Sequence, residues 1–166
     1  MTRITPLPML ALATTILWSP AQSEQRPASF DPVEFFKGRT RGDGTLKIVF
    51  QSPKKVSVES LGRVETDGSL ILTQRVAEEG KAPRSRSWHL RQVAPGRFAG
   101  TLSDASGPVA VDVIGGRARI RYSDKDHLNF EQWLTPQGPK RVLNRMTVKR
   151  FGITVARLNE VIRKLD

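Results

Sequence analysis

Apolar and polar residues alternate along most of the chain from Thr45 to Arg150, in short runs that turn residues separate. The alternation is clearest at Val56–Leu61, Ser69–Gln74, Val109–Val113 and Arg117–Tyr122. Because successive side chains of a strand point to opposite faces, each run predicts a strand with one apolar face. Many short strands at even spacing predict an all-β sandwich or barrel.

Turn residues divide this region into a series of expected strands. The expected strands are Arg39–Gln51 (interrupted by Gly42-Asp43-Gly44), Lys55–Glu65, Ser69–Glu78, Arg84–Val93, Arg97–Ser103, Val109–Ile114, Arg117–Ser123, His127–Leu134 and Lys140–Arg150. The short connections favour an antiparallel up-and-down meander, in which each strand pairs with its sequence neighbours. Closing the meander into a β-barrel removes its exposed edges, and an open sandwich is the alternative.

The two ends of the region follow other patterns. Asp31, Pro32 and Gly38 suit the cap, first position and end of a short helical turn. Phe30, Val33 and Phe36 would share its apolar side and close one end of the β structure. The last segment, Ile153–Leu165, fits both a helical stripe and a strand, so both remain open.

The alternation also assigns the two faces of the sheet. An apolar set predicts a core or a cavity lining: Val56, Val58, Leu70, Leu72, Trp88, Leu90, Phe98, Leu102, Val109, Val111, Val113, Ala118, Ile120, Tyr122, Leu128 and Phe130. Most residues of the opposite register are polar, and Trp133 is an exception that the register does not explain. Ser60, Gln74, Arg86 and Gln132 fall in the inward register although they are polar. Either they face a cavity with an open mouth, or bulges shift the register near the strand ends.

The first residues predict export. Arg3 precedes a short apolar run, Met9–Trp18, and small residues follow at Ser19–Ser23, which is the layout of a secretory signal peptide. We therefore expect a signal peptide at residues 1–23, cleaved after Ala21 or Ser23, a polar leader at 24–29 and one domain at 30–166. The apolar run is too short to span a bilayer, and no later segment is apolar enough. The expected location is periplasmic or secreted, with no transmembrane segment after cleavage.

The net charge and the lack of cysteine limit the classes of partner that the chain is expected to bind. The chain has no cysteine, so an exported form relies on packing and has no cysteine to lipidate. Its formal net charge of +11 suggests anionic partners such as lipid headgroups or envelope polysaccharide, while export disfavours nucleic acid. The alternative is a charge that serves solubility. The residues expected to meet an anionic surface are Arg84, Arg91, Arg117, Arg119 and Arg121.

The sequence offers no convincing catalytic, metal or cofactor site. Its two histidines, His89 and His127, fall on different expected strands, and zinc requires three or four ligands. Nothing in the sequence positions Ser87, His89 and Asp112 as a triad. The chain is therefore expected to be a binding or structural protein rather than an enzyme.

A barrel with an open mouth predicts a site for a small apolar or amphipathic ligand. Trp88, Phe98, Tyr122 and Phe130 would line the site, and Arg86 or Gln132 would orient a polar group of the ligand. Ordinary core packing is the alternative role of these aromatic residues.

The chain resembles the bacterial domain-of-unknown-function family numbered 3833. Phe30–Gly44 is similar to the opening signature of that family, and Phe130–Leu134, Val142–Met146 and Lys149–Val155 are similar to its closing strands and phenylalanine–glycine corner. The resemblance implies a lipocalin-like barrel in the bacterial envelope, with a final strand rather than a helix. It implies no activity.

Overall fold

The alternating runs form strands as predicted. The structure is a computed structural model that describes residues 30–166. Within this range a helix, α1 (Pro32–Phe36), precedes ten strands. The strands are β1 (Gly38–Ile48), β2 (Lys54–Val64), β3 (Leu70–Glu78), β4 (Arg84–Ala94), β5 (Arg97–Leu102), β6 (Val109–Ile114), β7 (Arg117–Ser123), β8 (Leu128–Pro136), β9 (Arg141–Arg150) and β10 (Ile153–Lys164).

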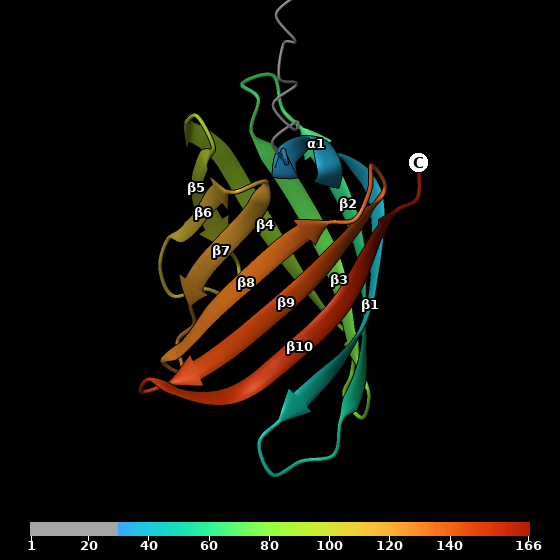
Figure 1. Cartoon of the computed structure of the whole chain (residues 1–166), viewed down its shortest axis with the longest axis vertical. Helices are drawn as coiled ribbons and strands as arrows, with labels where there is room; N and C mark the ends of the chain where they lie inside the picture. The colour runs from blue at the N-terminus through green and yellow to red at the C-terminus, as the bar shows by residue number, and fades with distance from the viewer. Residues whose placement is uncertain (1–29) are drawn as a thin grey trace, which may run out of the picture.

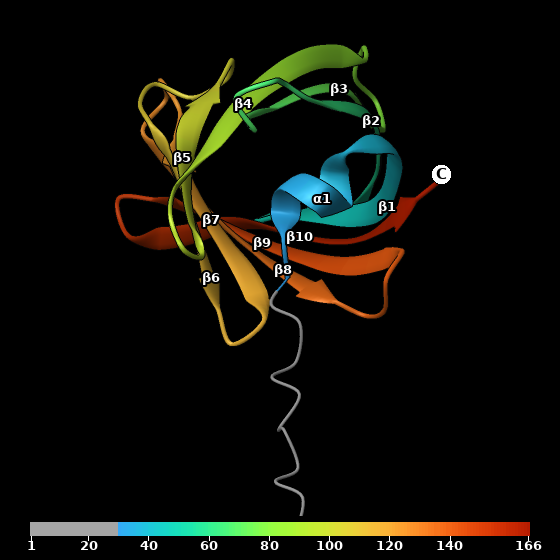
Figure 2. The same ribbon diagram turned by 90° about the horizontal axis from the view of Figure 1, so that it is seen from above.

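Each strand pairs antiparallel with its sequence neighbours, and β1 pairs with β10 to close the barrel (Figures 1 and 2). The up-and-down barrel is therefore confirmed over the open sandwich. Closure depends on the last segment, which is a strand. In β10 every residue from Ala156 to Lys164 has a partner on β1.

The first strand corrects one expectation. Gly42-Asp43-Gly44 does not interrupt β1, which runs continuously from Gly38 to Ile48. A Cβ on Gly44 would lie 2.5 Å from the carbonyl oxygen of Asn159. The glycine therefore permits a close approach of β1 to β10 and is not a turn residue.

Helix α1 lies across one end of the barrel (Figure 2). Asp31 caps it as predicted, accepting hydrogen bonds from the backbone N–H of Val33 (2.8 Å) and Glu34 (3.3 Å). Its buried face differs from the expected one, because Phe35 is buried beside Phe36 while Phe30 and Val33 are only partly buried. At the other end of the helix, Lys164 Nζ donates to the carbonyls of Glu34 (3.0 Å), Phe35 (3.2 Å) and Lys37 (2.6 Å), which ties the helix to β10.

The interior contains two apolar clusters. The larger packs under α1 and includes Phe36, Leu70, Trp88, Val111 and Leu134. The smaller consists of Val56, Val58, Val76 and Leu158, with Leu46 and Met146 against it. Every residue of the predicted apolar face is buried or half-buried, so the predicted register is correct.

No helix of residues 30–166 is long and apolar enough to cross a membrane. The expected signal peptide at residues 1–23 and the leader at 24–29 lie outside the described residues.

Candidate functional site

Six polar side chains project into the barrel between the two apolar clusters. We call them the polar layer: Ser60, Gln74, Arg86, Gln132, Asn144 and Glu160. Five of them are buried and Arg86 is half-buried. The pairing Gln74↔Arg86 belongs to a regular stretch of the β3–β4 ladder, and Ile120↔Gln132 to a regular stretch of β7–β8. Bulges therefore do not explain the inward polar residues, and the alternative of a shifted register is wrong.

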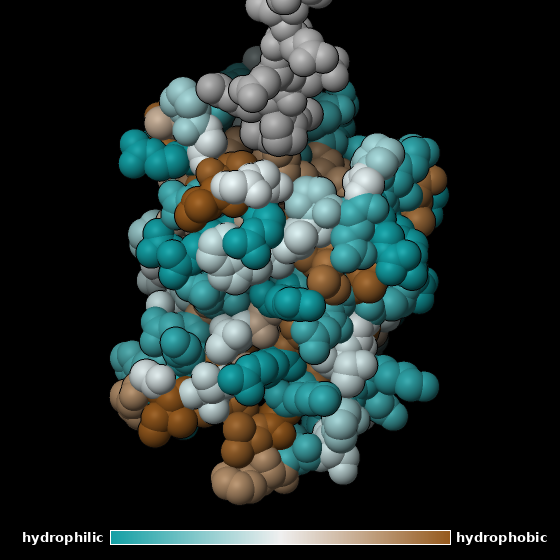
Figure 3. Space-filling model, viewed as in Figure 1, coloured by the Kyte–Doolittle hydropathy of each residue, from teal (hydrophilic) through white to brown (hydrophobic). Residues whose placement is uncertain are grey.

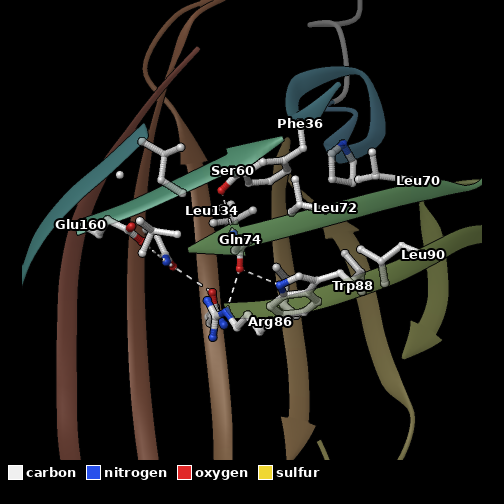
Figure 4. Close-up of a pocket in the computed structure, with 18 residues that line it drawn as sticks. Phe36, Ser60, Leu70, Leu72, Gln74, Arg86, Trp88, Leu90, Leu134 and Glu160 are labelled. Carbon is white, nitrogen blue, oxygen red and sulfur yellow. Dashed lines mark hydrogen bonds between the residues drawn. The ribbon is translucent and has the colours of Figure 1, made fainter. Parts of the chain in front are cut away.

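Gln74 is the centre of one half of the layer (Figure 4). Its Oε1 accepts hydrogen bonds from Arg86 Nε and Trp88 Nε1, both at 2.7 Å. Its Nε2 donates to Ser60 Oγ at 3.0 Å. One side chain thus satisfies polar groups from two neighbouring strands and holds Arg86 in place above the ring of Trp88, 5.4 Å from the guanidinium carbon to the ring centroid.

The other half of the layer is a chain of hydrogen bonds. Asn144 Nδ2 donates to Glu160 Oε2 (2.9 Å) and to Gln132 Oε1 (3.3 Å). Gln132 Nε2 donates to the hydroxyl of Tyr122 at 3.3 Å. Asn144 Oδ1 is buried and has no hydrogen-bond partner among the described residues. The chain therefore leaves one acceptor free inside the barrel.

Glu160 occupies space that a glycine leaves open. Glu160 pairs with Gly44 on the β1–β10 ladder, but its side chain lies over the diagonal neighbour Gly42. A Cβ on Gly42 would lie only 1.9 Å from Glu160 Oε1. A side chain at position 42 would compete with the carboxyl group for the same space. The absence of a side chain at Gly42 therefore leaves room for the Glu160 carboxyl group in the polar layer.

Burial changes the proton affinity of two groups in the interior. Desolvation raises the pKa of Glu160, and this effect outweighs the hydrogen bond from Asn144 and the charge of Arg86. Desolvation also raises the pKa of Tyr122 against the opposing charge of Arg86. Arg86 makes no ion pair within residues 30–166, so its charge is not neutralised by a carboxylate in contact.

The raised pKa of Glu160 predicts a pH-dependent penalty on folding. The folded state keeps this proton to a higher pH than the unfolded state, so ionisation of Glu160 lowers stability as pH rises from about 4.5 through the folded pKa. We expect Glu160→Gln to match the wild type near pH 4 and to become the more stable protein at pH 8. The difference should grow by about 1.4 kcal/mol per pH unit within the window between the two pKa values. Urea unfolding at several pH values measures it.

Glu131 provides a control for which stability changes with pH in the opposite direction. Hydrogen bonding from Arg119 lowers the pKa of Glu131, so its contribution to stability is present above the unfolded pKa and is lost as pH falls. Glu131→Gln should therefore be the less stable protein near neutral pH. An unchanged pH profile in Glu160→Gln would contradict the assigned environment of Glu160.

Three hollows adjoin the polar layer. The helix-side cavity, about 50 Å³, lies among the larger apolar cluster, under Pro32 and Phe36 of α1. The mouth-side cavity, about 90 Å³, adjoins the smaller cluster and the rings of Tyr122 and Phe130. The mouth groove, about 550 Å³, lies at the end of the barrel opposite α1, between the β5–β6 and β7–β8 connections. The interior is thus mostly filled, and of these three hollows the mouth groove is the one with the volume of a small-molecule site.

Arg86 is the single described residue that lines all three hollows. Tyr122 and Phe130 line both the mouth-side cavity and the mouth groove, and their rings are stacked with centroids 4.7 Å apart. The layer thus places a cation and a flat apolar surface next to each other at the mouth.

The structure brings together five of the six residues predicted for a ligand site. Trp88, Arg86 and Gln132 line the helix-side cavity, and Tyr122 and Phe130 lie on the mouth side of the same layer. Phe98 does not join them. It is 6% exposed in the larger apolar cluster and lines none of the three hollows, so packing is its observed role.

The five arginines predicted to meet an anionic surface are spread over the outer wall. Arg84 pairs with Asp104, Arg119 with Glu131, and Arg121 with Asp112, so three of them already have a carboxylate partner. Arg91 is exposed on β4. Arg117 lies over the ring of Trp133, 4.7 Å from its centroid. These contacts indicate that most of the five arginines stabilise the outer surface of the barrel and do not form an unpaired cationic surface.

The same contacts explain Trp133. Its ring is on the outer face of β8, packed against Arg117 and Arg119, and its Nε1 donates to Glu131 Oε1 at 3.2 Å. An outward tryptophan is therefore consistent with the register.

Sequence reasoning missed Asn144 and Glu160 as members of the site. Each lies between apolar residues at a spacing of two, Asn144 between Val142 and Met146 and Glu160 between Leu158 and Ile162. For Asn144 that spacing was a usable signal, because Lys140–Arg150 is an expected strand. For Glu160 it was usable only if the last segment is a strand, because a helix would put Glu160 on a different face. Within residues 30–166 no group of three or more histidine, cysteine, aspartate or glutamate side chains is arranged to hold a metal ion.

Comparisons with known proteins agree on the fold. The family model described as "Protein of unknown function (DUF3833)" matches residues 9–164. No curated protein matches the chain. Among solved structures, the S-type phycobiliprotein lyase CPES from Guillardia theta is similar, with a TM-score of 0.65, 10% identity and coverage of 81% of this chain and 90% of that chain.

Two further solved structures are similar. Rv2717c from M. tuberculosis has a TM-score of 0.62 and 17% identity, covering 83% of this chain and 100% of that chain. A protein of unknown function from the DUF3598 family of Nostoc punctiforme has a TM-score of 0.62 and 11% identity, covering 82% of this chain and 50% of that chain. At these identities the similarity shows a shared lipocalin-like fold and nothing more.

Proposed function

This chain belongs to the DUF3833 family of proteins of unknown function, and on that premise we propose that it binds a small amphipathic molecule at the mouth of its barrel. An anionic group of the ligand would contact Arg86, and its apolar body would lie on Tyr122 and Phe130 in the mouth groove. The single observation that carries the proposal is the position of Arg86, which lines all three hollows at the polar layer and is in no ion pair among the described residues.

The geometry supports an anionic group for a physical reason. A guanidinium offers several N–H donors in one plane, and Gln74 uses only Nε. Its remaining donors match a carboxylate or sulfonate, with which arginine forms charge-assisted hydrogen bonds. Two of the three acidic residues that line the groove have other partners: Asp104 pairs with Arg84, and Asp124 Oδ1 accepts from the backbone N–H of Asp126 and Leu128.

The size of the groove supports a small ligand rather than a long buried chain. About 550 Å³ lies within the range of ordinary ligand sites, whereas the two interior cavities are far smaller. We therefore place the apolar body at the mouth and leave the helix-side cavity as packed core.

Binding is tested with two probes, the fluorescent sulfonate 1-anilinonaphthalene-8-sulfonate and dodecanoic acid as its competitor. We expect saturable binding by the wild type and displacement by dodecanoic acid. Arg86→Met should weaken the binding of both probes by tenfold or more, because hydrogen bonds to a charged group contribute about 1.5–3 kcal/mol. Arg91→Met, an exposed position on the same strand, is the control and should bind like the wild type.

Dodecanol separates charge recognition from apolar burial. It should compete more weakly than dodecanoic acid with the wild type and equally weakly with Arg86→Met. Absence of probe binding, or equal binding by wild type and Arg86→Met, would contradict the proposal. Purifying the protein from the periplasmic fraction of a bacterial host tests export as well, because a mature chain beginning at Gln22 or Glu24 is expected.

A further inference from the structure

Two hairpins at the end of the barrel opposite α1 expose phenylalanine side chains to solvent. Phe50, in the β1–β2 connection, has a relative exposure of 103%, and Phe151, in the β9–β10 turn, has 79%. Val49 (46%) and Ile153 (70%) flank them and are exposed as well. Figure 3 shows apolar surface at this lower end of the molecule.

The backbone conformation of Phe50 and Phe151 indicates that these side chains do not stabilise the fold. Phe50 has a φ of 62° and Phe151 a φ of 48°, in the left-handed region that side-chain-bearing residues other than asparagine and aspartate seldom adopt. Phe151 and Gly152 both have positive φ in a two-residue turn, where asparagine–glycine is the favoured pair. Phenylalanine therefore adds backbone strain at both tips without gaining burial in the fold, a combination that points to a role outside folding.

The two tips lie on the same side of the barrel. Ile48 at the end of β1 pairs with Ala156 of β10, and Val49 N–H donates to the carbonyl of Val155 at 3.0 Å. Ile153 pairs with Arg150 across the β9–β10 turn. Because β1, β10 and β9 are neighbours in the sheet, both tips lie at the mouth end of the barrel on adjacent hairpins (Figure 1).

Cations surround the exposed apolar residues. Five exposed basic side chains lie on the strand ends next to the tips, and none of them is in an ion pair within residues 30–166. They are Lys47, Lys55, Lys149, Arg150 and Arg157. The guanidinium of Arg150 lies over the ring of Phe151, 5.5 Å from its centroid. This edge differs from the outer wall, where three of the five predicted surface arginines already have a carboxylate partner.

We propose that this edge, which we call the tip face (Val49, Phe50, Phe151, Ile153 and the five basic residues), docks on an anionic phospholipid bilayer. Exposed phenylalanines can be buried at the boundary between headgroups and acyl chains, and basic residues beside them are attracted to anionic headgroups. Neither feature alone selects a bilayer, but apolar tips ringed by unpaired cations match its apolar interior and its charged surface together.

The proposal goes beyond ligand binding and does not depend on it. The mouth groove lies at the same end of the barrel as the tip face, because the β5–β6, β7–β8 and β9–β10 connections all lie there. A docked protein would hold its groove close to the membrane surface, a suitable position for taking up or releasing an amphipathic molecule.

Vesicle flotation tests the docking. We expect the protein to float with vesicles of phosphatidylcholine and phosphatidylglycerol (7:3) and to float much less with phosphatidylcholine alone. Phe50→Ser combined with Phe151→Ser should weaken binding to the mixed vesicles by roughly tenfold or more. Leu61→Ser combined with Ile114→Ser removes exposed apolar residues (60% and 48% exposed) away from the tip face and should leave binding unchanged.

Insertion of the tips has a signature that surface adsorption lacks. The chain contains no cysteine, so a single cysteine at position 50 can carry an environment-sensitive nitrobenzoxadiazole label. Mixed vesicles should shift the emission of the label at Phe50→Cys to the blue and leave a label at Ile114→Cys unchanged. Circular dichroism confirms that each variant is folded.

Three results would overturn the proposal. No binding to mixed vesicles would refute it, as would equal binding by the wild type and the double serine variant. Binding that high salt abolishes, without a blue shift at position 50, would indicate attraction to any polyanion, envelope polysaccharide included. Loss of probe binding in Arg86→Met with intact flotation would leave the two sites independent, as proposed.

Discussion

Replacing Gln74 with leucine is expected to lower the free energy of unfolding by about 2–4 kcal/mol. Leucine fills similar space but accepts no hydrogen bond, so it leaves Trp88 Nε1 and Arg86 Nε without the acceptor that both use at 2.7 Å. Trp88 is 5% exposed, so water cannot readily replace the lost partner. An unpaired buried donor costs more than the hydrogen bond itself contributed, and here two donors are left, one of them charged. Urea unfolding measures the loss.

Two variants control for this loss. Ser60→Ala removes only the acceptor of Gln74 Nε2 and should cost about 1 kcal/mol. Gln92→Leu makes the same chemical change at an exposed position of β4 and should stay within about 0.5 kcal/mol of the wild type. A Gln74→Leu protein as stable as Gln92→Leu would show that the hydrogen bonds at Gln74 contribute little.

Replacing Gly42 with valine is expected to destabilise the protein by about 2–3 kcal/mol, although valine favours strands and glycine does not. The added Cβ would meet the carboxyl group of Glu160, which Asn144 holds by a hydrogen bond and which lies 4% exposed in the interior. Either the carboxyl group moves and loses Asn144, or the β1–β10 ladder opens. Both outcomes reduce stability in urea unfolding.

The cause can be isolated by a double-mutant cycle. Glu160→Ala clears the space that the valine needs, so the double variant should recover much of the loss, with a coupling of about 1–2 kcal/mol. Thr45→Val, an exposed position of the same strand, should change stability by less than about 0.5 kcal/mol. Additive effects of Gly42→Val and Glu160→Ala would disprove the steric account.

These variants also connect stability to the proposed site. Gln74 positions Arg86, so a folded Gln74→Leu protein should bind the anionic probe more weakly than the wild type. The polar layer thus has two separable roles. Its hydrogen bonds stabilise the barrel, and Arg86, which uses its Nε for Gln74, also lines the mouth groove.

Most of the fold followed from alternation because a strand has a fixed side-chain period. The period of two fixed which residues of β2 to β8 face inward, including Arg86 and Gln132, without any knowledge of neighbouring strands. Asp31 with Pro32 likewise indicated the start of α1.

The site was harder to predict because it depends on partners distant in sequence. The carboxyl group of Glu160 accepts a hydrogen bond from Asn144 on β9 and lies over Gly42 on β1, and neither contact leaves a trace in the local pattern. The sequence alone indicated a break in the strand at Gly42, because a glycine required for close packing cannot be distinguished there from a glycine required for a turn. Phe98 had the right type and the right face, but its height along the barrel, set by the β4–β5 register, removes it from the hollows.

The sequence by itself determined the strands, their inward faces, the cap of α1 and the presence of polar residues on the apolar side. Only the tertiary structure decided that the sheet closes through β1 and β10, that six polar side chains meet in one layer, and that the volume suited to a ligand lies at the mouth. The physical reason is that side-chain direction is a property of each strand alone. Closure, hydrogen-bond partners and cavity shape arise from strands that are far apart in the chain and meet only when it folds.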